Sequence, residues 1–408
     1  MRLFPGFILA LWLIGGLLFV SLLLREGQLF VVAVILLLVS SVSQLWERYC
    51  LHGLRYRRVL GQTRAFFGEE VPLTIEIVNE KPLPLAWLEV EDTVPGLGLT
   101  LQPAHVGPSH LPGRRLLSML LSVRWYERVR RHYRVTCAAR GIHAFGPAVL
   151  RTGDIFGLST REMDIPREDY LLVYPRIVPL ERLGLPASHP FGEVPLQRQW
   201  LFEDPMRTVG VREFRPGDNP RRLHWKATAH APGQTLQVKL FEPTTTHRLH
   251  VLLNVGTSDL NWSWQGYDPD ALEAAITIAA SVASWAAERS LLIGLSANAK
   301  LFHSTDAVRI RPSRDPRQLM HIFEALARLV PMPSMAPETL VELEGRELAF
   351  GTTVVMVTAV ANQALLQQLR RLRRGGHQPI LLLISAAEQP LAPLDGLPAY
   401  AIRIEDTR

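Results

Sequence analysis

RLHVLLNV, at residues 248–255, is a continuous apolar run of the kind that forms a strand buried on both faces of a parallel sheet. Similar runs recur downstream, each followed or preceded by a stretch with helical features. The strand candidates are SLLIGLSA (290–297), TTVVMVTAV (352–360) and PILLLISA (379–386); the helices open at Asp268-Pro269, at Asp315-Pro316 and near Ala361, the last ending at Gly375-Gly376. Strands that alternate with helices predict a largely parallel sheet covered on both faces, so we expect residues 236–408 to form an α/β domain.

VREFRPGDNPRRLHWKATA, at residues 211–229, lies just upstream of that domain. Its pattern predicts a strand, a turn and a helix. Pro216-Gly217 fits the two central positions of a type II turn. Asn219 or Asp218 is a suitable N-cap, and Pro220 suits the first position of the helix, which we expect to end near Gly233.

Basic residues crowd the start of that predicted helix. Arg221, Arg222 and Lys226 fall in its first turns, where cations oppose the helix dipole. We expect anions to hold them, either Glu213 and Asp218 or a group on a partner. This local conflict is the best physical indication of a site in the chain.

Further upstream, residues 56–160 contain short strand candidates separated by turns. TIEIVNE (74–80) and AWLEVED (86–92) alternate apolar and polar side chains with period two. The longer candidates are LLSMLLSVRW (116–125), ERVRRHYRVTCAA (127–139) and AVLRTGDIFGL (148–158). We predict a β-sandwich-like domain over residues 47–165 and a connecting segment over 166–235 that carries the 211–229 motif. No Cys-Trp-Cys spacing supports a specifically immunoglobulin-like topology.

Two apolar stretches without a charged side chain begin the chain, LFPGFILALWLIGGLLFVSLLL (3–24) and QLFVVAVILLLVSSVSQLW (28–46). At about 1.5 Å per residue, each is long enough as a helix to cross the roughly 30 Å hydrocarbon core of a bilayer. We predict a transmembrane helical hairpin over residues 1–46. A cleaved signal peptide is the alternative, but its apolar stretch is shorter and no second span follows it.

Arginines indicate the orientation of this hairpin. Residues 47–58 carry Arg48, Arg55, Arg57 and Arg58, whereas the turn between the spans carries Arg25. Because excess positive charge stays on the cytoplasmic side, we expect both termini and the whole body to lie in the cytoplasm, anchored to the inner (plasma) membrane.

The amino-acid composition and charge exclude several classes of protein. Two cysteines in 408 residues exclude a disulfide scaffold, and 30 prolines with 28 glycines show no collagen-like period. The net charge is +6, and residues 47–140 hold 14 Lys/Arg against nine Asp/Glu. We interpret this excess as contact with lipid headgroups, since no basic face with interleaved aromatics or known motif indicates a nucleic-acid partner.

The 211–229 motif resembles the signature of the bacterial domain of unknown function 58 family. The matching positions are Arg212, Glu213, Phe214, Gly217, Asp218, Arg221, Leu223, Trp225, Lys226, Thr228 and Ala229; the chain departs at His230, where an arginine is usual, and mildly at Ala227-Thr228. The two N-terminal spans, the Gly153-Asp154-Ile-Phe-Gly-Leu turn and the Tyr-Pro-Arg at 174–176 are also similar to the family, so the resemblance covers nearly the whole chain.

The resemblance implies a C-terminal domain like the von Willebrand factor type A domain and a partner among MoxR-type AAA+ ATPases, in assembly or envelope stress. It implies no settled activity. In a von Willebrand type A domain, the loop after the first strand carries D-x-S-x-S and coordinates Mg²⁺ or Mn²⁺ through hard oxygens. Here Asn254 replaces the first Asp and Gly256 the first Ser, leaving Ser258 with Asp259 beside it. We expect a degenerate, metal-free interaction face.

Catalytic signatures are absent from the sequence. It contains no G-x-x-x-x-G-K-[ST], H-E-x-x-H, C-x-x-C or G-x-S-x-G. Glu213 and Asp218 could pair for acid–base work, but salt bridges to neighbouring arginines explain them better. We therefore predict a membrane-anchored, non-enzymatic adaptor or scaffold without cofactor, with a divalent-metal-dependent protein-binding domain and an uncharacterised enzyme as alternatives.

Overall fold

The computed structural model describes residues 5–24, 27–103, 106–155, 159–185, 203–215, 223–230, 235–243, 248–258, 267–302, 307–385 and 397–407. The chain divides into two compact units, Met1–Pro175 and Arg176–Arg408.

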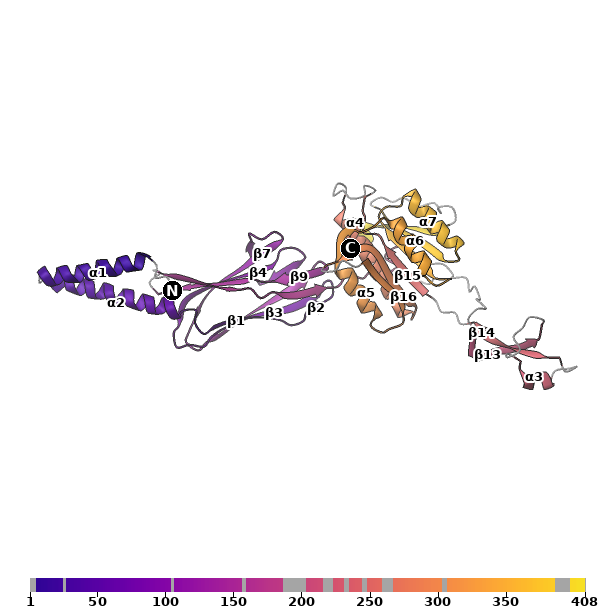
Figure 1. Ribbon diagram of the computed structural model, residues 1–408, viewed down its shortest axis with the longest axis horizontal. Coiled ribbons are helices and arrows are strands. Elements are labelled where there is room, and N and C mark those ends of the chain that lie inside the picture. The colour runs from indigo at the N-terminus through magenta and orange to yellow at the C-terminus, as the bar shows by residue number, and fades with distance from the viewer. Residues whose placement is uncertain are drawn as a thin grey trace. The chain divides into compact units, whose positions relative to one another are not determined.

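The first unit begins with two antiparallel helices that lie side by side, α1 (Pro5–Leu24) and α2 (Gly27–Tyr49) (Figure 1). Among the described residues, α2 is long and apolar enough to cross a membrane, and α1 contributes the shorter apolar stretch Trp12–Leu24. By length and composition, therefore, α2 could span a membrane. Trp46, near the end of α2, packs against the core of the β-rich region that follows.

That region contains two antiparallel sheets and a smaller third sheet. The sheets have the orders β1-β3-β8-β5, β11-β10-β4-β7-β6 and β2-β12-β9. The strands are β1 (Leu54–Leu60), β2 (Arg64–Ala65), β3 (Glu70–Asn79), β4 (Leu85–Pro95), β5 (Leu99–Gln102), β6 (Val106–Pro108), β7 (Arg114–Val123), β8 (Arg128–Cys137), β9 (Gly141–Phe145), β10 (Ala148–Gly153), β11 (Thr160–Ile165) and β12 (Asp169–Val173).

Alternation explains how the two large sheets share one core. Leu73, Ile75 and Ile77 of β3 point inward and are fully buried, and Leu88 and Val90 of β4 meet them from the other sheet. The prediction of a β-sandwich-like domain agrees with this arrangement. The domain extends beyond the predicted end at residue 165, because β12 pairs with β2 and β9.

The second unit contains the predicted α/β domain. Its sheet has the order β17-β16-β15-β19-β20-β21, with β18 also paired to β16. The strands are β15 (Arg248–Leu253), β16 (Leu292–Leu301), β17 (Ala307–Ser313), β18 (Leu329–Pro333), β19 (Thr353–Thr358), β20 (Gln378–Ser385) and β21 (Ala399–Arg403). β15, β16, β19, β20 and β21 run parallel, and β17 and β18 are antiparallel to β16.

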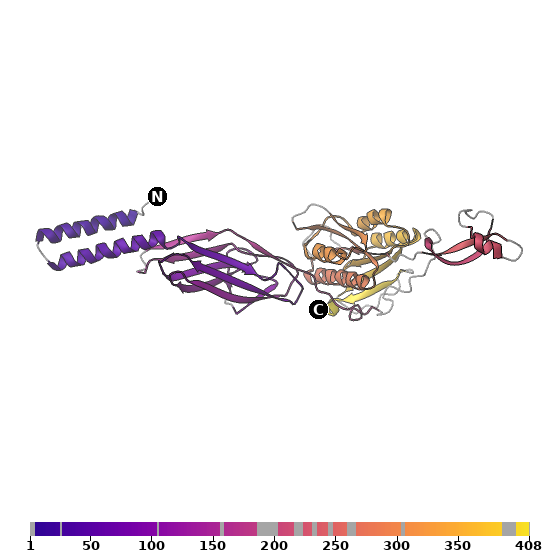
Figure 2. The ribbon, with the colours of Figure 1, turned by 90° about the horizontal axis from the view of Figure 1, so that it is seen from below.

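Helices flank this sheet (Figure 2). They are α4 (Pro269–Glu288), α5 (Gln318–Ala327), α6 (Pro337–Glu347) and α7 (Gln363–Arg374), and the short 3-10 helix Ile404–Thr407 follows β21. Asp268 caps α4 as predicted, because its carboxylate accepts from Asp270 N and Ala271 N. Leucines of α6 and α7 form one core with Leu252, Val354 and Met356 of the sheet.

A separate pair of strands precedes the α/β domain in sequence. β13 (Glu203–Glu213) and β14 (Gln237–Pro243) are antiparallel, and the short helix α3 (Trp225–His230) lies between them in the chain. We call these three elements the arm; it contains the described part of the 211–229 motif.

Candidate functional site

The order of the parallel strands locates the position where such a sheet binds ligands. Counted from β15 with β18 left out, the sheet order is 3-2-1-4-5-6, in which the third strand, β17, is the antiparallel one. The connections therefore leave β15 and β19 toward opposite edges of the sheet. Ligands of open α/β sheets bind outside the carboxyl ends of the strands, at this switch point. Asn254 follows β15 and Thr358 ends β19, so both lie there.

Asn254 is the centre of a hydrogen-bond network at this point. Its Oδ1 accepts from the backbone N–H of Gly256 at 3.0 Å and from Nδ2 of Asn298 at 2.7 Å. Its Nδ2 donates to Oγ1 of Thr358 at 2.9 Å. Because a backbone N–H can only donate, the bond from Gly256 fixes which end of the Asn254 amide carries the oxygen.

Asn298, on β16, completes the network. Its Oδ1 accepts from Val255 N at 2.9 Å, and its Nδ2 also donates to the carbonyl of Met335 at 3.0 Å. Asn254, Asn298 and Thr358 are all buried, at 4%, 1% and 0% exposure. We call these three residues the amide network.

The amide network does not suit a divalent cation. Mg²⁺ prefers carboxylate oxygens with free lone pairs, but Oδ1 of Asn254 already accepts two hydrogen bonds. Oγ1 of Thr358 accepts from Asn254 and from Val360 N while donating to Val360 O. Of the remaining loop residues, Ser258 is described and Asp259 lies outside the described residues.

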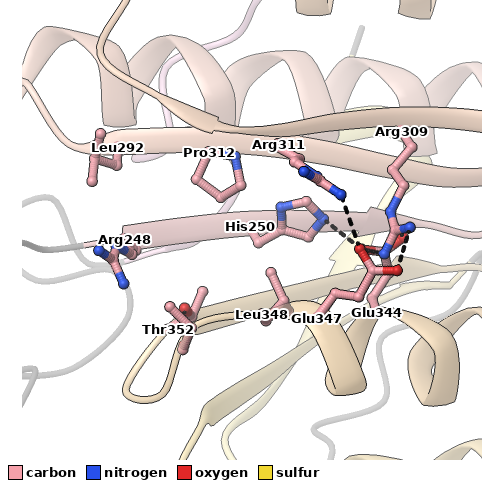
Figure 3. Close-up of a pocket in the computed structure, with 11 residues that line it drawn as sticks. Arg248, His250, Leu292, Arg309, Arg311, Pro312, Glu344, Glu347, Leu348 and Thr352 are labelled. Atoms are coloured by element: carbon pink, nitrogen blue, oxygen red, sulfur yellow. Dashed lines mark hydrogen bonds and ion pairs between the residues drawn. The ribbon is translucent and has the colours of Figure 1, made fainter.

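A cavity of about 280 Å³ lies at the opposite, amino end of the same strands (Figure 3). Two arginines and two glutamates of its lining pair with one another. Arg309 Nε lies 2.9 Å from Glu344 Oε1, Arg309 Nη1 lies 2.9 Å from Glu347 Oε1, and Arg311 lies 3.3 Å from Glu347. Arg309 lowers the pKa of the Glu347 carboxyl by hydrogen bonding to it. The polar lining is thus largely occupied by its own ion pairs.

His250 forms the floor of this cavity and is almost fully buried. Burial, with a smaller contribution from Arg309, lowers its pKa to about 4, so it is neutral at pH 7. Its Nε2 lies 2.9 Å from Ser296 Oγ and 3.7 Å from Glu344 Oε2. A catalytic triad places the acid and the nucleophile on different ring nitrogens. Here both approach Nε2, and Ser296 is fully buried, so the arrangement is structural.

The arm places the start of the 211–229 motif, residues 211–213, on strand β13, as predicted. Arg212 pairs with Val238 and Glu213 with Gln237, and Phe214 N donates to Leu236 O at 2.8 Å. The Arg212 guanidinium donates to the carbonyl of Glu213 at 3.0 Å. Three motif residues from the predicted turn and helix start, Gly217, Asp218 and Arg221, lie outside the described residues.

The helix of the motif begins later than predicted. Leu223 forms a β-bridge with Val238, and His224 N donates to Gln237 O at 2.8 Å, so the chain is still paired with β14 at these positions. α3 starts at Trp225 and is capped by His224 Nδ1, which accepts from Ala227 N at 3.0 Å. The prediction of a helix from Pro220 missed this cross-strand pairing, which the local pattern does not reveal.

Trp225 and Lys226 both lie on the surface of α3. The Trp225 side chain is 70% exposed, whereas Thr228 on the same helix accepts from Gln237 N at 2.9 Å and ties α3 to β14. Single exposed apolar side chains are common on protein surfaces, and tryptophan is enriched among the residues that dominate interfaces. The arm therefore presents an aromatic and a cation side by side.

Comparison with known proteins gives little functional guidance. No protein-family model matches the chain. The chain is 25% identical to "Uncharacterized protein YeaD" of Bacillus subtilis (strain 168) over 214 residues, which are 52% of this chain and 50% of that protein. The match thus spans half the length of this relative.

Solved structures are similar to a limited part of the chain. A CARDB domain from Pyrococcus furiosus matches 29% of the chain and 91% of its own length, with 7% identity and a TM-score of 0.20. A cohesin module from Clostridium perfringens ATCC13124 matches 29% of the chain and 96% of its own length, with 12% identity and a TM-score of 0.21. Likenesses of this size assign no function.

Proposed function

We propose that this protein is a membrane-anchored, non-enzymatic adaptor that holds a protein partner through the arm. The observation that carries the proposal is the exposure of Trp225 beside Lys226 on α3. Tryptophan is enriched at the centres of protein interfaces, because it buries a large apolar area and keeps one polar N–H. Lys226 adds a charge that orients an acidic partner surface.

The anchor in this proposal is the N-terminal pair of helices. α2 has 23 residues, about 35 Å of helix, which exceeds the thickness of the hydrocarbon core. α1 has 20 residues and packs beside α2, which supports a hairpin of two spans. The arginines after α2 favour an orientation with both termini in the cytoplasm, at the inner (plasma) membrane.

The resemblance to the domain of unknown function 58 family supplies the class of partner, a MoxR-type AAA+ ATPase acting in assembly or envelope stress. The strand order of the α/β domain is compatible with a von Willebrand factor type A-like domain. In our proposal this domain works without a metal, because the oxygens of the amide network already accept hydrogen bonds within the protein.

Two features support an adaptor over an enzyme. His250 and Ser296 are buried together, so a substrate cannot reach the hydroxyl. Among the described residues, no group of three or more His, Cys, Asp or Glu side chains could hold a metal ion.

The test is affinity capture of the tagged full chain from native membranes, with Trp225→Ala/Lys226→Ala beside the unsubstituted protein. Leu343→Ala/Arg346→Ala is the matched control, because α6 also presents an exposed apolar residue and a cation. We expect an AAA+ ATPase to be enriched with the unsubstituted chain and the control, and lost with the arm variant. Equal capture by all three proteins would refute the arm as the docking site.

A further inference from the structure

Three turns of the β domain lie at the end where α2 enters it. β1 starts at Leu54, directly after α2, and pairs there with Asn79 at the end of β3. The β3–β4 turn therefore lies at this end, and so does the β7–β8 turn, because Val78 pairs with Arg128 and Leu85 with Val123. Thr152 pairs with Leu88, near the start of β4, which brings the β10–β11 turn to the same end.

Hydrogen bonds connect these turns to the end of α2. Lys81 Nζ, which is buried, donates to the carbonyl of Cys50 at 2.5 Å, and Lys81 O accepts from Tyr126 N at 3.3 Å. Asn79 Nδ2 donates to the carbonyl of Arg124 at 2.8 Å. These bonds hold the β7–β8 turn beside Cys50, the residue that directly follows α2.

A second connection lies further back along the helix. Ser43 Oγ, within α2, donates to Asp154 Oδ2 at 2.7 Å, and Asp154 Oδ1 accepts from Ser159 N at 2.9 Å. Asp154 is fully buried, and Arg161 Nε lies 2.9 Å from Glu47. The aspartate of the Gly153-Asp154 turn, which the sequence indicated only as a structured turn, therefore fastens the β domain to the helix.

These contacts set the depth of the domain relative to a bilayer. Glu47 is the first charged side chain after the apolar stretch 28–46 and pairs with Arg161, so the hydrocarbon boundary falls on the N-terminal side of Glu47. The stretch from Glu47 to Cys50 covers about 5 Å along the helix axis, within a headgroup layer of about 5–8 Å. The turns fastened to this stretch therefore lie among the headgroups.

The exposed side chains at this end suit that environment. Trp125 is 64% exposed, Tyr126 68%, Ile155 49% and Tyr49 44%, and Arg124 is also exposed. Tryptophan and tyrosine favour the membrane interface because each combines an apolar ring with a polar tip. Arginine complements the anionic lipids of the cytoplasmic leaflet.

We propose that this end of the β domain is a lipid-binding surface, in which Trp125 and Tyr126 insert among the headgroups of an anionic bilayer. The inference rests on the proposed function, because it needs α2 to cross the membrane. It goes further, because in it the β domain itself contacts the membrane surface, in one fixed orientation. The occupant is a lipid surface, because the contacts with Glu47 and Cys50 hold these side chains at headgroup depth.

The experiment uses the full chain in vesicles of phosphatidylcholine and phosphatidylglycerol, with an environment-sensitive fluorophore at Pro82→Cys. Pro82 is exposed in the β3–β4 turn, so labelling it leaves Trp125 and Tyr126 intact. Leu97→Cys is the control, because Leu97 is 77% exposed and lies at the opposite end of the domain. The native cysteines are both buried, and the unsubstituted chain measures their background labelling.

We expect a quencher attached to the lipid near its headgroup to quench the label at position 82 strongly and the label at 97 hardly at all. Adding Trp125→Ser/Tyr126→Asn should remove most of the quenching at 82; asparagine suits position 126, whose φ is +51°. Equal quenching at 82 and 97, or quenching at 82 that survives the double substitution, would overturn the inference. Alkaline extraction of the same samples tests the helical anchor separately. If the unsubstituted chain were extracted from the vesicles at alkaline pH, the anchor itself would be refuted.

Discussion

Substitution of Asn298 by alanine tests whether the amide network holds the switch point together. The Asn298 side chain satisfies two backbone groups, the buried N–H of Val255 and the partly buried carbonyl of Met335. Asn298→Ala leaves both without their partner. Each unsatisfied buried group costs about 1–3 kcal/mol, so we expect the free energy of local opening to fall by about 2–5 kcal/mol.

Native-state amide hydrogen exchange of the full chain measures this loss, because it resolves one segment from another where global unfolding of two units does not. Since every 1.4 kcal/mol is a factor of ten, exchange in peptides that contain Val255 should accelerate by at least about thirtyfold. Peptides from β3, in the other unit, should not change.

Asn362→Ala is the matched control. Asn362 caps α7 by accepting from Leu365 N at 2.8 Å, so its loss should cost about 1 kcal/mol and affect the first turn of α7 alone. If exchange at Val255 in Asn298→Ala stayed within about threefold of the unsubstituted chain, the substitution would have lowered the free energy of local opening by less than about 0.7 kcal/mol. The reasoning that this side chain secures the loop would then be refuted.

Three further predictions concern buried titratable groups. Arg58 Nη2 lies 2.5 Å from Asp92 Oδ1 with both side chains buried, so Arg58→Ala should destabilise the β domain by about 3–5 kcal/mol, and an unchanged melting temperature would contradict this. The pKa of His250 is about 4 in the folded protein, below its unfolded value of about 6.5. As the pH drops from about 6.5 to 4, the unfolded state binds a proton that the folded state does not, so the free energy of unfolding should fall over this range. His250→Gln should flatten that dependence in pH-resolved melting of the α/β domain, and an identical slope would refute the assignment. Burial raises the pKa of the Cys137 thiol to about 11, so alkylation at pH 8 should be slow in the native protein and fast in denaturant, and rapid native alkylation would contradict the buried position.

Much of the fold could be predicted because its signals are local. The apolar run at 248–255 becomes β15, and Asp268-Pro269 begins α4 where expected. The alternation at 74–80 places Ile75 and Ile77 in the core. Each of these features depends on residues within one element, which is the range over which periodicity and capping act.

The parts that could not be predicted depend on pairing between distant segments. The start of α3 at Trp225 follows from the bridge between Leu223 and Val238. The amide network needs Asn298 and Thr358 beside Asn254, and only the strand order brings them together. The sequence does contain a weak signal, since each polar residue lies at or just beyond a predicted apolar strand.

The attachment of the β domain to α2 was also beyond sequence reasoning. Ser43 lies in an apolar span and Asp154 in a glycine-flanked turn, and they are separated by 111 positions. Neither residue is unusual in its own context. Only the folded arrangement shows that a hydroxyl in the helix meets a buried carboxylate of the β domain.

Photo-crosslinking from position 225 in living cells tests the central claim most directly. A photoreactive phenylalanine analogue replaces Trp225 in the full chain, and the same analogue at the exposed Leu343 of α6 is the control. If the protein is an adaptor that docks its partner through the arm, position 225 should give a discrete crosslinked product containing an AAA+ ATPase, and position 343 should not. If neither position gave a product with an ATPase, or both gave the same one, the arm would not be the docking site and the adaptor account would fail.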